Sequence, residues 1–453
     1  MFNKKPVVKE EKKLSLDGKK KKAPPELLRG FRDVLPEEQA KWDAVRDQAR
    51  GMADAYSFGR IELPVLERAD LWTRTLGKHT DVVEKEMYTF IDPSETQVAL
   101  RPEGTASIAR AYINHGMWNL PQPVKLWYDL PMFRHDRPQA GRYRQHQQIG
   151  FEVLGVQDPV VDAQLILIAT RLFQDLGIKV SVQLNSIGTP ESRQAYLTQL
   201  TAYFRTHRAK LSEEDKHRLQ KNPLRLLDSK DPQTIELLAA APQILDWLDE
   251  DSKNHFMKVI EYLDEVQVPY VLNPHLVRGL DYYTHTVFEI WQEGDAGDRA
   301  QNSLCGGGRY DRLVEVMGGE RPAPACGFAF GIERAVRAMT ESGSAPELRN
   351  RPKIFFAQLG DAARRVGLRV FEEFRKAHVL IAEASGKNAL KSQLEAANKL
   401  GVAYALILGQ KEVLDGTILV RDMESGAQET VDILKIVPMM EKKLSGGSVE
   451  AES

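Results

Sequence analysis

The chain has 453 residues and a formal net charge of −2 at pH 7, with 42% hydrophobic and 28% charged residues. These values are typical of globular proteins with two or three domains, and any nucleic acid they bind must meet a local basic surface. The sequence has no long apolar run and no signal-peptide pattern, so we expect a cytoplasmic protein with no membrane partner.

The N-terminal segment, residues 1–26, is a lysine-rich tail with little apolar surface to bury, and we expect it to be disordered. Its lysines either keep the chain in solution or tether it to RNA phosphates, and the sequence leaves both readings open.

The next segment alternates between helical and extended patterns. Residues 37–56 predict a helix, and residues 59–66 predict a strand interrupted by Pro64. Because proline donates no ladder hydrogen bond, this strand should lie at a sheet edge or an interface. Residues 86–91 and 96–102 should pair as a hairpin. The first large domain is therefore predicted to be α+β, with an antiparallel sheet flanked by helices packed on one side.

A short loop between two apolar runs is rich in arginine: Arg134, Arg137, Arg142 and Arg144. Arginine binds phosphate or carboxylate oxygens in pairs, so this spacing around Pro138 and Gly141 indicates a strand-loop-strand hairpin that closes over an anionic substrate. A solvated basic turn is the plain alternative, and the loop alone does not decide between them.

The remaining chain predicts a helical insertion and a separate C-terminal unit. Residues 190–265 have helical spacing, and strand-like sequence returns at 268–272 and 286–291. Beyond a linker at residues 341–350, three strands alternate with two helices, as in a doubly wound α/β unit with a mostly parallel sheet. The strands are 353–359, 378–382 and 404–408; one helix spans 361–376 and the other carries Leu390, Leu394 and Ala397. We expect domains at residues 27–345 and 350–440, and a flexible tail at 441–453.

Several common sites are missing from the sequence. It contains no GxxxxGK[ST] loop and no HExxH helix, and the glycines that follow Cys305 lack GxGxxG spacing. Only two cysteines are present, Cys305 and Cys326, which excludes a four-cysteine zinc site and favours buried thiols. Any nucleotide must therefore bind on another scaffold.

Four segments together resemble histidyl-tRNA synthetases, which are class II aminoacyl-tRNA synthetases: Leu100-Arg-Pro-Glu-Gly-Thr105, the arginine loop, Leu276-Val-Arg-Gly-Leu-Asp-Tyr-Tyr-Thr284 and Gly327-Phe-Ala-Phe-Gly-Ile-Glu-Arg334. The third segment is peculiar to the family, whereas the second and fourth resemble motifs two and three of the class. The Pro64 strand resembles motif one, which implies a homodimer. The C-terminal unit resembles the family's anticodon-binding domain.

The resemblance implies that L-histidine attacks the α-phosphate of ATP to form histidyl-adenylate, and that the histidyl group then passes to the 3′ end of tRNA(His). Arg134 and Arg278 would be catalytic, both gripping the α-phosphate, and Arg278 would also bind the substrate carboxylate. Arg334 would hold the γ-phosphate, with Arg142 and Gly307 as further ATP-binding residues. Mg²⁺ would bridge the phosphates.

The histidine site implied by the resemblance consists of Arg278, Glu103, Gly104, Thr105, Gln148, Glu152, Tyr282 and Tyr283. Glu103, Thr105 and Gln148 would hold the ammonium group, and Glu152 with Tyr283 would bind the ring nitrogens.

Plain alternatives exist for most of these residues. Glu103 and Thr105 also fit a helix start, Tyr282 and Tyr283 fit core aromatics, and residues 306–308 fit a turn. Arg278, which we expect inside an apolar strand, needs a partner.

Two positions depart from the family pattern, in or beside the loop expected to approach the tRNA acceptor end. His146 stands where an aromatic residue is usual, and Ala140 where a basic one is common. Two other functions use the same fold: a histidine-binding regulator of ATP phosphoribosyltransferase, and an RNA-binding scaffold. The regulators typically lack the Arg278 segment and the C-terminal domain, and a scaffold would have lost charged pocket residues that are present here.

Overall fold

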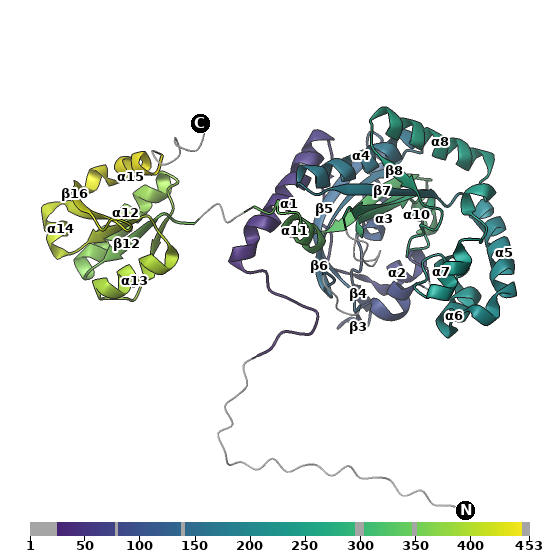
Figure 1. Ribbon diagram of the computed structural model, residues 1–453, viewed down its shortest axis with the longest axis horizontal. Coiled ribbons are helices and arrows are strands. Elements are labelled where there is room, and N and C mark those ends of the chain that lie inside the picture. Colours follow the sequence, from purple (N-terminus) through teal and green to yellow (C-terminus); the bar gives the residue numbers. More distant parts are fainter. Residues whose placement is uncertain (1–24, 78–79, 137–140, 295–302, 347–350, 446–453) are drawn as a thin grey trace, which may run out of the picture. The chain divides into compact units, whose positions relative to one another are not determined.

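The computed structural model describes residues 25–77, 80–136, 141–294, 303–346 and 351–445. The predictions for residues 1–24, Arg137, Pro138, Ala140 and residues 446–453 lie outside this part of the chain. The chain divides into two compact units, one that includes Trp42–Ala345 and one that includes Pro346–Ser453 (Figure 1). No helix among the described residues is long and apolar enough to cross a membrane.

An eight-stranded mixed sheet forms the centre of the first unit. Its strand order is β1 (Gly59–Arg60), β5 (Val124–Phe133), β6 (Gln145–Leu154), β11 (Ala325–Gly331), β10 (Ser303–Arg309), β9 (Thr284–Gln292), β7 (Val180–Ser186) and β8 (Tyr270–Leu272). The six inner strands are antiparallel, as predicted, and the short edge strands β1 and β8 join in parallel.

Helices cover both faces of this sheet, so the prediction of helices on one side is wrong. One face packs against α1 (Pro36–Ala55), α4 (Pro159–Asp175), α8 (Glu250–Glu265) and α11 (Ile332–Glu341), and the other against α2 (Ala69–Thr75), α3 (Thr105–Asn114) and α10 (Leu313–Val316). Alternation along β6 explains why: Ile149, Phe151 and Val153 enter the first core, whereas Gln148 and Glu152 face the second side.

A three-stranded sheet joins β2 (Leu66–Arg68), β4 (Gln97–Leu100) and β3 (Thr89–Ile91). The predicted hairpin is confirmed, and the Asp92 carboxylate closes its turn by accepting backbone N–H bonds from Ser94 and Thr96 at 2.9 Å. The strand predicted at residues 59–66 is instead two strands in different sheets, β1 and β2, with Pro64 between them. Both strands lie at the edge of their sheet, as Pro64 suggested.

Residues 190–265 are helical, as their spacing predicted. They contain α5 (Pro190–Thr206), α6 (Glu213–Lys221), α7 (Pro232–Leu238) and α8, which lie together beside the sheet in Figure 1. Each helix begins after a side chain that accepts a backbone N–H bond, supplied by Thr189, Ser212, Asp231 and Asp249 in turn.

The second unit is an α/β fold in which helices pack against a five-stranded sheet. The strand order is β13 (Ile381–Glu383), β12 (Ile354–Gln358), β14 (Tyr404–Leu408), β15 (Thr417–Asp422) and β16 (Gln428–Asp432), with helices α12 (Asp361–Lys376), α13 (Leu390–Leu400), α14 (Gln410–Asp415) and α15 (Ile436–Ser445). The three predicted parallel strands are present. The sheet is nevertheless mixed, because β15 and β16 are antiparallel. His378, placed in a strand by the prediction, has φ +56° in the turn after α12.

Candidate functional site

The centre of the site is the buried carboxylate of Glu152 on β6, which is 1% exposed. It accepts hydrogen bonds from the Thr105 hydroxyl at 2.8 Å and from the Tyr310 hydroxyl at 2.5 Å. Gly327 lies opposite Glu152 in the ladder, and any Cβ there would overlap the carboxylate. The glycine therefore makes the space that this side chain fills.

A second buried carboxylate, Glu103, lies at the start of α3. It accepts backbone N–H bonds from Thr105 at 2.7 Å and from Ala106 at 2.9 Å, so the helix-start reading of this segment is correct. The same geometry brings Glu103 close to Glu152, because Thr105 bonds to both. Gly104, at the N-cap, is packed against the Tyr128 ring, which leaves no room for a side chain. A pair of buried carboxylates at a helix N-terminus suits a cationic or N–H-bearing ligand.

Burial controls the ionisation of both acids. It raises the pKa of Glu103, and it raises the pKa of Glu152 to about 8 although the hydrogen bonds from Tyr310 and Thr105 act in the opposite direction. Glu152 is therefore mostly protonated at neutral pH.

Replacing Glu152 by glutamine is expected to change how stability depends on pH. The folded pKa lies above the unfolded value of 4.5, so the folded wild type holds an extra proton between pH 4.5 and 8 and loses stability as pH rises through that window. Glutamine cannot ionise, so the variant does not share this loss. Its free energy of unfolding, relative to that of the wild type, should rise by about 3 kcal/mol between pH 4.5 and 7. Urea unfolding at several pH values measures this, and a difference independent of pH would contradict it.

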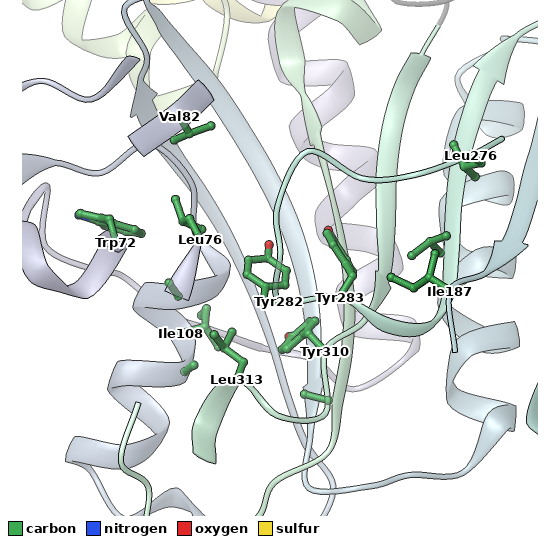
Figure 2. Close-up of a cluster of buried hydrophobic side chains, with 14 of the residues drawn as sticks. Trp72, Leu76, Val82, Ile108, Ile187, Leu276, Tyr282, Tyr283, Tyr310 and Leu313 are labelled. Carbon is green, nitrogen blue, oxygen red and sulfur yellow. The ribbon is translucent and has the colours of Figure 1, made fainter. Parts of the chain in front are cut away.

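Four buried tyrosines, Tyr128, Tyr282, Tyr283 and Tyr310, lie around the two carboxylates, and we call this group of side chains the pocket. The ring centroids of Tyr282 and Tyr283 are 4.7 Å apart, and Tyr310 packs edge-on to Tyr282 at 5.6 Å. Figure 2 shows the three rings together between Leu76 and Ile187. On β5, the Tyr128 hydroxyl donates to the Gln148 side chain at 3.1 Å. The core-aromatic reading of Tyr282 and Tyr283 is correct as far as burial goes, but both rings also border the two carboxylates.

Tyr128 and Tyr310 are site residues that the sequence interpretation missed. The ladder places Tyr128 opposite Gly150, on the same face of the sheet as Gln148 and Glu152. Tyr128 could have been predicted from the alternation of side chains along β5 and from the register of β5 with β6. No comparable signal marked Tyr310, which follows β10 directly and reaches Glu152 from 158 positions along the chain.

Arg278 lies in a segment without regular structure, so its expected place inside an apolar strand is wrong. The partner expected for it is present: its guanidinium donates to the carboxylate of Glu289 on β9, and it also lies over the Tyr283 ring, 5.9 Å from the centroid. Arg278 thus borders the tyrosines of the pocket.

The glycine stretch at residues 306–308 belongs to strand β10, so the turn reading is wrong. A Cβ at Gly306 would overlap the Arg278 guanidinium, and one at Gly308 would lie 2.9 Å from the Tyr283 ring. A Cβ at Gly307 would meet the Gly327 carbonyl oxygen at 2.5 Å, which prevents a side chain there. The sheet needs glycine here to pack closely beneath the site.

A cluster of arginines lies beside this pocket. Arg134 donates to the Pro102 carbonyl at 2.7 Å, Arg142 lies 3.4 Å from Asp136, and Arg334 donates to the Ser303 carbonyl. Burial, together with repulsion from Arg142 and its other cationic neighbours, lowers the pKa of Arg334 to about 10. Guanidinium groups that repel one another in a partly buried site are suited to a polyanion such as a triphosphate.

His146 belongs to strand β6, where it pairs with Met132. Burial and the positive charges of Arg134 and Arg334 lower its pKa to about 3, so its ring is neutral at physiological pH. The His146 ring therefore lies next to the arginine cluster, and because it is neutral it adds no positive charge to the cluster.

Comparisons with known proteins agree with this geometry. A family model described as histidyl-tRNA synthetase matches residues 30–335, and one described as an anticodon binding domain matches residues 353–443. A histidine–tRNA ligase of Dehalococcoides mccartyi is 44% identical over 92% of this chain and 99% of its own length, and one of Halorhodospira halophila is 45% identical over 88% and 94%. The crystal structure of apo histidyl-tRNA synthetase from S. aureus is 33% identical with a TM-score of 0.75, covering 92% of this chain and 99% of that one.

Proposed function

The chain belongs to the histidyl-tRNA synthetase family and is an ATP-dependent histidine–tRNA ligase of protein synthesis, and we propose that the pocket around Glu103 and Glu152 and the adjoining arginine cluster carry its first step. The observation that supports this assignment is the position of Arg278. Its guanidinium lies over the Tyr283 ring on one side and against Gly306 of β10 on the other. Strand β10 also accepts a hydrogen bond from Arg334 of the arginine cluster.

In the proposed reaction a carboxylate oxygen of L-histidine attacks the α-phosphorus of ATP. A new oxygen–phosphorus bond forms, the bond to the β-phosphate oxygen breaks, and pyrophosphate leaves with that electron pair. Arg134 and Arg278 stabilise the charge that accumulates on the α-phosphate oxygens, and Arg334 and Arg142 hold the outer phosphates. Because Arg278 also binds the substrate carboxylate, it brings the nucleophile and the electrophile together.

Histidine itself is held by the buried carboxylates. Glu103, Thr105 and Gln148 receive the ammonium group, while Glu152 and Tyr283 bind the two ring nitrogens. A neutral imidazole has one N–H donor and one acceptor nitrogen, so an amino acid without them would leave buried groups unpaired. This requirement explains how the pocket rejects other side chains of similar size.

Magnesium would enter with ATP. In such sites Mg²⁺ keeps several waters and is held by substrate phosphates and one or two carboxylates, so a cage of protein ligands is not needed. Glu86, whose carboxylate interacts with Arg134 and Arg142, fits this requirement. The ion would offset phosphate charge as pyrophosphate forms.

We also propose a homodimer that works in the cytoplasm on tRNA(His). Leu66, Phe90 and Ile91 of the small sheet are exposed, which suits a surface covered by a second subunit. The second unit, which matches an anticodon-binding domain, would contact the anticodon bases.

Ending the chain at residue 345 should separate the two steps. Pro346–Ser453 group with Leu35–Lys41 in the second compact unit, and the residues assigned to adenylate formation all belong to the first. We expect histidine-dependent ATP–pyrophosphate exchange to stay within about threefold of the full chain, and tRNA charging to fall by about a hundredfold because base contacts are lost. Unchanged charging by the truncated chain would remove the anticodon role from this unit.

The proposed site is tested first by ATP–pyrophosphate exchange, which measures adenylate formation without RNA. Exchange should require histidine and should fail with other amino acids. Histidine binding without exchange would instead support the regulatory alternative.

A further inference from the structure

We infer that Glu289 is a positioning residue for adenylate formation: it fixes the guanidinium of Arg278 before the substrates bind. The inference rests on the role proposed above for Arg278. Glu289 lies on β9, in the interior of the large sheet between β10 and β7. Arg278, in contrast, is on a segment with no regular structure, so its own backbone does little to hold its side chain.

The contact between the two side chains is direct and partly sheltered from water. A guanidinium nitrogen of Arg278 donates to a Glu289 carboxylate oxygen, and the two side chains are only 20% and 17% exposed. The Nε of Arg278 is buried and has no hydrogen-bond partner among the described residues. Glu289 thus holds one end of the guanidinium, while the buried Nε donor has no partner among the described residues.

Glu289 is held in its turn. Its other carboxylate oxygen accepts a hydrogen bond from the indole of Trp291 at 2.7 Å. In the neighbouring strand Gly306 is the ladder partner of Glu289, and its lack of a Cβ leaves the space that the Arg278 guanidinium occupies. Contacts from Trp291 through Glu289 to Arg278 therefore connect strand β9 to the segment without regular structure that carries Arg278.

The Glu289 carboxylate offsets the charge of a largely buried guanidinium, but it also has a cost for the reaction. A negative charge beside a catalytic arginine weakens its attraction for phosphate, so the pairing costs binding energy for ATP. Arginine has several rotatable bonds, and an unfixed guanidinium would have to be ordered as the transition state forms. The Glu289–Arg278 pair favours the reaction if orienting the guanidinium lowers the barrier by more than the weakened attraction for phosphate raises it. A charge that is already oriented stabilises a transition state best.

The test is a double-mutant cycle on histidine-dependent adenylate formation, measured in single turnovers with the full chain. Glu289→Ala should lower the rate by about 30-fold to 100-fold while the KM for ATP changes by less than about threefold. Glu289→Gln, which keeps an acceptor for Arg278, should recover a large part of that loss. In an Arg278→Ala background the same Glu289→Ala change should lower the rate by less than about twofold.

Controls separate positioning from other roles. Glu293→Ala removes an exposed carboxylate at the end of the same strand and should leave the rate unchanged. Equal losses from Glu289→Ala in both backgrounds, or a changed Mg²⁺ requirement, would overturn the inference, because Glu289 would then act on substrate or metal directly. A fall in thermal stability with parallel losses in every rate constant would also overturn it. Wild-type protein without exchange would contradict the proposed function instead.

Discussion

Replacing Arg278 by alanine is expected to lower histidine-dependent ATP–pyrophosphate exchange by about a hundredfold to a thousandfold, the usual effect of removing a preorganised group that stabilises transition-state charge. The Arg278 guanidinium adjoins both the Tyr283 ring and Gly306 of strand β10. Its loss would leave the substrate carboxylate and the α-phosphate unlinked. We expect most of the effect in kcat, because the interaction strengthens as charge develops.

Arg278→Lys is the matched variant. Lysine keeps the positive charge but not the planar fork, so it should recover only part of the lost rate. Circular dichroism and thermal unfolding show whether the variant stays folded. Exchange within about threefold of wild type in Arg278→Ala would assign the catalytic role to another cation.

Patterns within single segments predicted much of the fold and part of the site. The arginine-rich stretch was expected to join two paired strands, and β5 and β6 pair over ten residues on each strand. The helix start at Thr105 was also expected, because Pro102 and Glu103 are typical of a first turn. These features depend on neighbours in the sequence, which is why a single sequence is enough to predict them.

The sequence did not predict features that depend on how distant segments meet. Arg278 needed a partner, but only the register of β9 and β10 brings Glu289 to it. Tyr310 is one tyrosine among thirteen, and its contact with Glu152 depends on β11 lying between their strands. The strand β16 was missed because Gln428–Asp432 is short and polar, and it forms only by pairing with β15.

Glu152→Ala is expected to lower kcat/KM for histidine by about a hundredfold, while the KM for ATP changes by less than about threefold. Leaving a buried hydrogen-bonding group without its partner costs about 1–3 kcal/mol, and the loss of Glu152 leaves both the Tyr310 hydroxyl and the substrate ring without one. ATP binding should be unaffected because the Glu152 carboxylate bonds to Thr105 and Tyr310, and not to the arginines assigned to the phosphates. Exchange assays with each substrate varied in turn measure the two effects.

One further variant and one analogue of histidine make this test more specific. Tyr310→Phe removes only the donor to Glu152 and should cost less than Glu152→Ala, since the carboxylate remains buried and bonded to Thr105. Thienylalanine, whose five-membered ring has no nitrogen, should be rejected by the wild type and less strictly by Glu152→Ala. Equal losses for histidine and ATP would mean that Glu152 supports the pocket as a whole. A selective loss for histidine, with weaker rejection of thienylalanine, would mean that the buried carboxylate recognises the imidazole ring.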